Sequence, residues 1–222
     1  MISRTIATET HGRYIVVPPP REPRGLIVGF HGYAEPAEAA LARMQTIEHA
    51  DEWLLVAVQG LSRFYRGRTR DIIASWMTSQ DRELAIADNI RYVAAVVDAA
   101  ANEWRVAGPL VFTGFSQGVA MAYRAACALP RAVSGVIALG GDIPPELEGA
   151  ALSRLKSALV GRGVRDEWYT DDTFRADVAR LRAAAVEVSD VTVDVGHEWT
   201  DEFSAAAAAF LNCVQRSDPA ST

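Results

Sequence analysis

The sequence contains little cysteine, a single lysine and no long apolar segment. Among 222 residues, cysteine occurs only at Cys127 and Cys213, which is too few for the disulfide framework of a small secreted domain. No apolar run approaches the length of a bilayer-spanning helix. The first ten residues also lack the apolar core of a signal peptide. We therefore expect a cytoplasmic protein with no integral membrane association.

Basic residues are outnumbered by acidic ones. Lys156 is the only lysine, and 22 basic residues face 28 acidic residues, for a formal net charge of −6. A mildly acidic surface disfavours nucleic acid as a partner. Half of the residues are hydrophobic and 23% are charged, which is typical of a globular protein and not of a disordered one. The length suits one domain spanning residues 1–222.

Motifs that bind metals or nucleotides are also missing. There is no HExxH or CxxC, and the acidic residues lack ligand spacing. No glycine-rich loop of the GxGxxG or phosphate-binding type opens a helix. We expect the protein to use neither a metal nor another cofactor.

Short apolar runs alternate with helical patterns along the chain. Unbroken apolar runs of this length are typical of central strands that are covered on both faces. The predicted strands are 14–17, 26–30, 54–58, 110–112, 136–139, 157–160 and 191–195, and the predicted helices are 36–50, 81–104, 117–129, 172–186 and 201–214. This alternation predicts an α/β fold with a mostly parallel sheet between two helical layers. No repeat or linker divides the chain, and residues 217–222 are predicted to form a frayed tail.

Residues 61–79 do not follow this alternation of strands and helices and are predicted to form a long loop. Thr78 and Asp81 fit a capping box for the helix that follows. Loops at the carboxyl edge of a parallel sheet commonly build substrate sites. Four apolar side chains are candidates for a substrate pocket: Phe64, Trp76, Met77 and Trp168. Ordinary packing is the alternative interpretation.

The segment from Gly114 to Gly118, with sequence GFSQG, carries the clearest chemical signal. It follows a predicted strand and precedes a predicted helix, which is the setting of a nucleophile elbow. Glycines on either side of Ser116 leave room for a sharp turn that exposes the serine hydroxyl. The sequence therefore predicts Ser116 as a nucleophile.

A nucleophilic serine needs a general base and a carboxylate that orients the base. His197 follows the last predicted strand, whereas His11 and His49 are expected to be exposed or structural. Asp166 follows the strand 157–160 and completes the chain order serine, acid, histidine. Its carboxylate would fix the imidazole tautomer and stabilise the imidazolium. Asp171 remains an alternative acid, although its place before a helix also suits an N-cap.

The step from His31 to Tyr33 follows an early predicted strand. Such a loop commonly supplies one backbone N–H of an oxyanion hole, and the residue after the nucleophile supplies the other. We assign these donors to the amides of Tyr33 and Gln117, and we expect the His31 side chain to hold the loop in place.

With these motifs in place, the chain resembles the phospholipase/carboxylesterase family of α/β-hydrolases, which includes bacterial carboxylesterases and acyl-protein thioesterases. The resemblance extends from about residue 14 to residue 214 and rests on short blocks in family order. These blocks are FHG at 30–32, WMTSQDRE at 76–83, GFSQG at 114–118, GGDIP at 140–144, Gly163 with Asp166, and GHE at 196–198.

The resemblance implies a single α/β-hydrolase domain with Ser116, Asp166 and His197 as its triad and with oxyanion donors at Tyr33 and Gln117. It also implies cofactor-free hydrolysis of small-molecule carboxylic esters or thioesters. The chain departs from the family pattern at Val119, where a glycine is common, and at Arg162 and Thr170, where histidine and proline are usual. These changes concern loop shape and specificity more than the chemistry.

Three functions remain open at this stage. Hydrolysis of carboxylic esters, including lysophospholipids, is the leading hypothesis, and hydrolysis of acyl-thioesters on the same triad is the first alternative. A non-catalytic ligand-binding protein of the same fold is the second, because a fold does not determine function. The sequence does not predict the acyl chain length, because one methylene changes binding by only about 1–3 kcal/mol. It does not predict the oligomeric state either.

Overall fold

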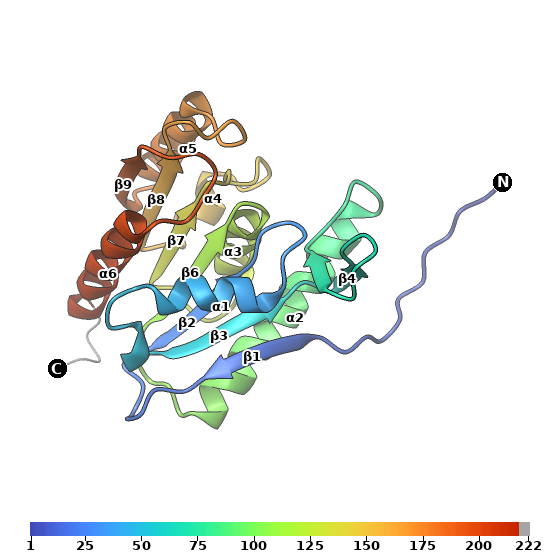
Figure 1. Ribbon diagram of the computed structural model, residues 1–222, viewed down its shortest axis with the longest axis horizontal. Helices are drawn as coiled ribbons and strands as arrows, with labels where there is room; N and C mark the ends of the chain where they lie inside the picture. Colours follow the sequence, from blue (N-terminus) through green and yellow to red (C-terminus); the bar gives the residue numbers. More distant parts are fainter. Residues whose placement is uncertain (218–222) are drawn as a thin grey trace.

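The computed structural model describes residues 1–217. Seven strands form the central sheet in the order β1-β3-β2-β6-β7-β8-β9, and only the edge strand β1 is antiparallel to its neighbour (Figure 1). The strands are β1 (Arg13–Val17), β2 (Leu26–Phe30), β3 (Leu54–Gln59), β6 (Leu110–Phe115), β7 (Gly135–Leu139), β8 (Ser157–Gly163) and β9 (Glu187–Val193). The predicted mostly parallel sheet is therefore confirmed.

Alternate residues of the central strands enter two separate apolar cores. In β2, Leu26, Val28 and Phe30 join one core, whereas Ile27 joins the other. All four side chains are almost completely buried, so both faces of the sheet are covered. This explains why the strands carry unbroken apolar runs and no polar alternation.

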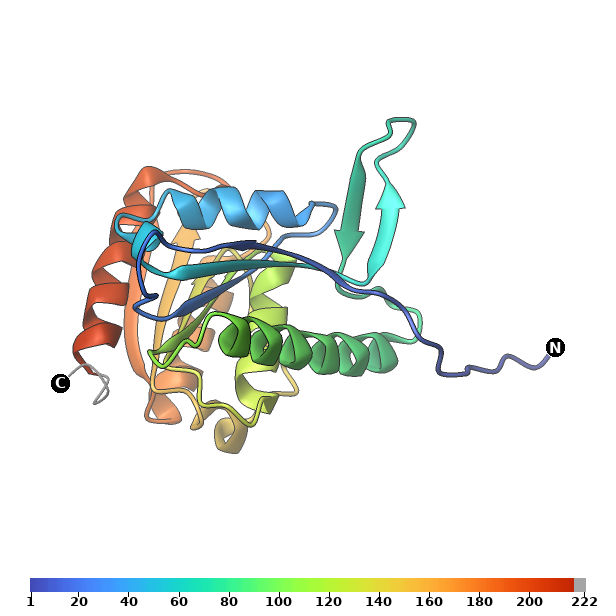
Figure 2. The ribbon, with the colours of Figure 1, turned by 90° about the horizontal axis from the view of Figure 1, so that it is seen from below.

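Helices cover both faces of the sheet, as Figure 2 shows from below. One core contains residues of α1 and α6, and the other contains residues of α2, α3 and α5. The helices are α1 (Ala37–Gln45), η1 (Ala50–Glu52, a 3-10 turn), α2 (Arg82–Glu103), α3 (Gln117–Ala128), α4 (Gly149–Leu152), α5 (Asp171–Ala183) and α6 (Asp201–Arg216). Within residues 1–217, no helix is both long enough and apolar enough to cross a membrane.

The segment 61–79 corrects the prediction of a long loop. It contains the antiparallel hairpin of β4 (Ser62–Tyr65) and β5 (Ile72–Ser75), which projects from the body of the fold in Figure 2. The hairpin is attached at its base, where the Ala34 amide donates to Ala74 O and the Ala74 amide donates to Glu35 O, each at 3.0 Å. Arginines and polar residues among its apolar ones concealed the strand pattern in the sequence.

Smaller differences concern element boundaries. The last strand ends at Val193 and begins at Glu187, four residues before the predicted start at 191. The capping box predicted from Thr78 and Asp81 does not form, because Asp81 adopts a left-handed conformation (φ 49°) and its side chain caps no amide. Of the predicted tail, Ser217 caps α6 and residues 218–222 lie outside the described residues.

The parallel strands bring several loops to one edge of the sheet. Phe30 at the end of β2 pairs with Gly114 of β6, and Phe115 pairs with Leu139 at the end of β7. Because parallel strands end at a common edge, the segments that follow β2, β6, β7, β8 and β9 lie together there.

Gly118 predicts a measurable packing constraint at this edge. A Cβ at Gly118 would lie 2.2 Å from Phe30 O, so helix α3 packs directly on the end of β2. We expect Gly118→Ala to lower the free energy of unfolding by about 1–3 kcal/mol through overpacking. Chemical denaturation measures this change.

Gly149→Ala is the matched control, since nothing lies within 4 Å of the Cβ it would add. We expect that variant to be unchanged or stabilised by up to about 1 kcal/mol. Equal stability of the two variants would contradict the close approach of α3 to β2.

Candidate active site

Ser116 lies in a sharp turn between β6 and α3. Its backbone has φ 54° and ψ −124°, a conformation rarely adopted by residues other than glycine. Its amide donates to Leu139 O at 3.0 Å, and its carbonyl accepts the Val119 amide at 3.0 Å. These bonds hold a strained residue at the start of a helix, as a nucleophile elbow requires.

Three glycines allow the turn to pack closely. A Cβ at Gly114 would lie 2.6 Å from the Gly118 carbonyl carbon, and a Cβ at Gly141 would lie 2.4 Å from Ser116 O. Gly118 meets Phe30 O, as described above. The glycines of the sequence motif therefore serve the backbone approach that the elbow needs.

His197 and Asp166 are hydrogen-bonded to each other at the same edge. His197 Nδ1 lies 2.8 Å from Asp166 Oδ2. The Asp166 side chain is almost completely buried, whereas that of His197 is partly exposed. Because the ionised carboxylate only accepts, Nδ1 carries the proton, and Nε2 of the neutral ring has a free lone pair.

His197 also packs beside the elbow. Its ring centroid lies 4.8 Å from that of Phe115, the residue directly before Ser116. A Cβ at Gly140 would lie 3.1 Å from His197 Cε1, and the neighbouring Gly141 contacts Ser116. Ser116 in the turn after β6, His197 in the loop after β9 and Asp166 in the loop after β8 therefore lie at the same edge of the sheet.

The backbone of the acid loop holds Asp166 in place. The Trp168 and Tyr169 amides donate to Asp166 Oδ1 at 2.9 and 3.0 Å, which leaves Oδ2 for His197. The Asp166 amide donates to Gly163 O at 3.1 Å. Buried carboxylates need such partners, because an unpaired buried charge is costly.

Arg162 fastens both ends of this loop. Its buried guanidinium donates to Val164 O at 3.2 Å and to Tyr169 O at 3.3 Å, while Nη1 lies 3.1 Å from Asp171 Oδ1. Asp171, the alternative acid, therefore faces Arg162 and also pairs with Arg175. Sequence reasoning noted Arg162 only as a departure from a family pattern and did not anticipate this contact.

The two predicted oxyanion donors belong to segments that meet at Gly118. Gln117 is the first residue of α3, where amides have no acceptor within the helix. The loop with Tyr33 packs on the start of α3, since a Cβ at Gly118 would lie 2.7 Å from His31 O. The positive end of the α3 dipole lies at Ser116, which is the N-cap of that helix.

His31 is a buried structural group of that loop. Its Nδ1 lies 2.7 Å from Gly32 O, and its Nε2 accepts the Gly60 amide at 3.0 Å. These contacts require a neutral ring that is protonated at Nδ1. Burial of the ring lowers the pKa of His31 from its usual value, in agreement with that tautomer.

Glu35 and Arg43 support the loop from the other side, and no sequence motif pointed to them. Glu35 Oε2 accepts the Gly32 amide at 2.7 Å, and Arg43 binds both carboxylate oxygens at 2.6 and 2.7 Å. Burial raises the pKa of Glu35, but these hydrogen bonds and the charge of Arg43 outweigh it and lower the pKa overall. Arg43 also stacks 4.1 Å above the ring of Phe115.

The four side chains suggested for a substrate pocket do not form one surface. The prediction of Trp76 as a pocket residue is corrected, because its indole is fully buried in the core and its Nε1 donates to His31 O at 2.8 Å. Met77 is half-buried, with Sδ 3.4 Å from Arg124 Nη1. Phe64 lies on the hairpin against Tyr33, and Trp168 is exposed on the acid loop.

Comparisons with solved structures show the same fold. The esterase PE8 is 23% identical with a TM-score of 0.72, over 92% of this chain and 100% of that chain. A carboxylesterase from Mesorhizobium loti is 19% identical with a TM-score of 0.74, over 94% and 98% of the two chains. Acyl-protein thioesterase 2 from Zea mays is 18% identical with a TM-score of 0.72, over 92% and 100%. A search of curated proteins found no match.

The sheet order, the covering helices and these similarities define an α/β-hydrolase fold. The family model for phospholipases and carboxylesterases matches residues 11–214. The chain therefore belongs to the phospholipase/carboxylesterase family.

His31 predicts an acid-sensitive contribution to stability. Because its pKa is lowered on folding, the folded state binds this proton less tightly than the unfolded state. The contribution is fully present above the ordinary pKa of 6.5 and is lost as the pH falls toward the folded-state value. We expect the unfolding free energy of the wild type, relative to His31→Gln, to fall below that pH by up to about 1.4 kcal/mol per unit.

Denaturation of both proteins at several pH values measures this difference. His11→Gln is the control, since it also removes one histidine, but one that is exposed on the N-terminal segment. A constant difference between wild type and His31→Gln across this range would contradict a buried neutral His31.

Proposed function

We propose that the protein is a serine hydrolase that cleaves carboxylic esters through an acyl-enzyme at Ser116. The observation that carries the proposal is the Asp166–His197 hydrogen bond beside the elbow of Ser116. In this arrangement His197 takes the proton of Ser116 as the hydroxyl attacks the ester carbonyl, while Asp166 stabilises the imidazolium.

The tetrahedral oxyanion is held by the amides of Tyr33 and Gln117. The contacts of Gly32 with Glu35 and of His31 with Gly60 fix the Tyr33 segment before substrate arrives. Such preorganised donors stabilise the developing charge, and each is worth roughly 3 kcal/mol in comparable sites. His197 then protonates the leaving group, and water resolves the acyl-enzyme by the same route.

Acyl-thioester hydrolysis is the alternative reaction of the same site. The solved structures similar to this chain include carboxylesterases and an acyl-protein thioesterase. Both reactions pass through the same acyl-enzyme, so the leaving group alone distinguishes them. The exposed Tyr33, Phe64 and Trp168 are candidates for contacting the apolar part of the substrate.

Substitution of the nucleophile tests the proposal. We expect a fluorophosphonate probe to label the wild type and not Ser116→Ala, because the probe reacts with an activated serine hydroxyl. Hydrolysis of p-nitrophenyl esters should fall by roughly 10⁴-fold or more in Ser116→Ala. Ser134→Ala, which removes a hydroxyl in the segment before β7, is the matched control and should label normally.

Equal failure of wild type and Ser116→Ala to react, beside a control hydrolase that labels, would support the non-catalytic alternative and overturn the proposal. A series of p-nitrophenyl esters of increasing acyl length, measured beside acyl-thioesters, then distinguishes the two reactions. A near-background profile over both series would count against this substrate class.

Arg162 predicts a second effect on the same activity. Its guanidinium joins Val164 O to Tyr169 O, and the amides between them fix Asp166. We expect Arg162→Gln to lower kcat about 10- to 100-fold with KM changed less than about 2-fold, because the loop no longer holds the carboxylate in one geometry. Steady-state kinetics on the best ester measures both constants.

Arg175→Gln is the matched control, since Arg175 also pairs with Asp171 but is exposed on α5 and contacts no carbonyl of the loop. It should keep the wild-type kcat. If thermal denaturation shows that the loss of kcat in Arg162→Gln equals the fraction of unfolded protein, Arg162 has no positioning role.

A further inference from the structure

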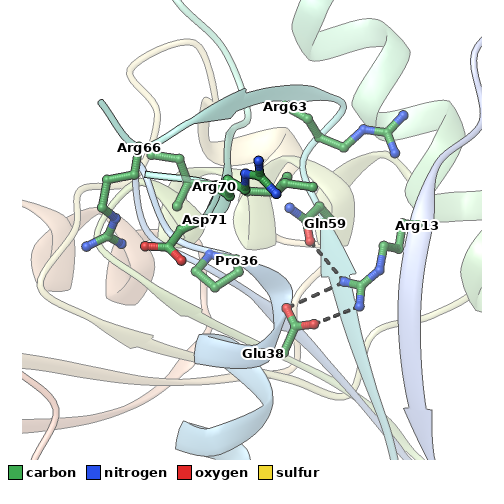
Figure 3. A pocket seen from close by; sticks show the side chains of 10 residues that line it. Arg13, Pro36, Glu38, Gln59, Arg63, Arg66, Arg70 and Asp71 are labelled. Carbon is green, nitrogen blue, oxygen red and sulfur yellow. Dashed lines mark hydrogen bonds and ion pairs between the residues drawn. The ribbon is translucent and has the colours of Figure 1, made fainter. Parts of the chain in front are cut away.

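A second concave site lies beside the hairpin, away from the proposed triad. It is a cavity of about 640 Å³ between the base of the hairpin, the start of α1 and the edge strands, and Figure 3 shows its side chains. Ten residues line it: Arg13, Pro36, Glu38, Gln59, Arg63, Arg66, Arg70, Asp71, Ile72 and Ile73. Ser116, Asp166 and His197 are not among them. We call it the arginine pocket.

Cations dominate the arginine pocket although the protein as a whole is acidic. Four arginines and two carboxylates line it, which gives a local net charge of +2 against −6 for the chain. Arg13 and Glu38 neutralise each other through a contact of 2.7 Å, and the hydrogen bond from Arg13 lowers the pKa of Glu38 although partial burial opposes that shift. The remaining charge therefore comes from the hairpin.

Three hairpin arginines line the pocket, and none of them forms an ion pair within residues 1–217. Arg63 donates to His11 O at 3.0 Å and Arg66 donates to Ala34 O at 3.2 Å, so each is held by a neutral carbonyl. Arg70 contributes a third guanidinium, and Asp71 is the single carboxylate opposite them. Neutral anchors orient a guanidinium but leave its positive charge uncompensated.

Gln59 adds a buried donor at the base of the pocket. Its side chain is 97% buried (3% exposed), and its Oε1 accepts both Arg13 Nη1 at 3.1 Å and the Ala37 amide at 3.2 Å. Two donors at Oε1 assign the other position to the amide nitrogen. In Figure 3 that nitrogen points away from Arg13, and it donates to no residue in the described part of the chain.

We propose that the arginine pocket binds a phosphate-bearing small molecule. Four arginines around one cavity favour an anionic ligand, and a phosphate with a charge near −2 also balances the net charge of the pocket. The Gln59 amide supplies an uncharged donor to the same anion. The volume lies within the range of small-molecule sites, so it holds a phosphate together with an organic group.

Pyrophosphate titrated by isothermal calorimetry at low salt tests the proposal. We expect saturable binding to the wild type and a Kd at least about 10-fold higher for Arg63→Gln and for Arg70→Gln, since each loses a charge-assisted hydrogen bond. Arg68→Gln is the matched control: it removes the same charge from the same hairpin, but Arg68 does not line the pocket. Its Kd should stay within about 2-fold of the wild type.

Three results would overturn the proposal. They are an absence of saturable binding, an equal loss of affinity in Arg68→Gln and Arg70→Gln, and tighter binding of succinate than of pyrophosphate. The arginines are exposed, so all variants should fold, and circular dichroism checks this. Ser116→Ala should bind pyrophosphate as the wild type does, which separates this test from that of the hydrolase.

Discussion

The buried Trp76 holds together the segments that surround the candidate site. Its indole N–H donates to His31 O, its amide donates to Gln117 Oε1, and its carbonyl accepts Asn89 Nδ2, at 2.8–3.0 Å. Its ring stacks on that of His31 with centroids 5.0 Å apart. One buried residue thus ties the end of β5 to the loop after β2, the start of α3 and helix α2. Buried polar groups are costly when unpaired, so each bond restricts where these segments lie.

This network holds the loop that carries Tyr33 and the first turn of α3 at fixed positions. The Gln117 side chain forms hydrogen bonds with Ser75 and with Met77 O. Its backbone amide, at the start of α3, has no acceptor within the helix and remains available as a donor. On the opposite side, Glu35 holds the Gly32 amide and Arg43 holds Glu35. The loop that carries Tyr33 is therefore fixed from both sides, and electrostatic preorganisation of this kind requires no rearrangement during reaction.

The sequence predicted the parts of the fold that obey a local rule. The central strands were recognisable because both faces are buried, and the elbow was recognisable because its glycines meet backbone at less than 3 Å. The hairpin was missed because β4 is exposed along its whole length and arginines fill the turn that follows it, so neither burial nor alternation marked the strand. Trp76 was misjudged as a pocket residue because composition cannot distinguish an aromatic that lines a cavity from one that fills the core. Contacts between distant segments, such as Trp76 with His31, left no local pattern in the sequence.

The acid loop shows why a departure from a motif need not change the geometry. Arg162 takes a place where the family usually has histidine, yet its longer planar side chain reaches two loop carbonyls and Asp171 together. The Trp168 and Tyr169 amides then bind Asp166 through backbone atoms, which a change of side chain does not remove. The carboxylate position therefore depends on the loop backbone, and any side chain that holds that backbone preserves it. The exposed Phe64 and Trp168, which we propose as substrate contacts, have no such protection, because no backbone contact of the fold depends on their side chains.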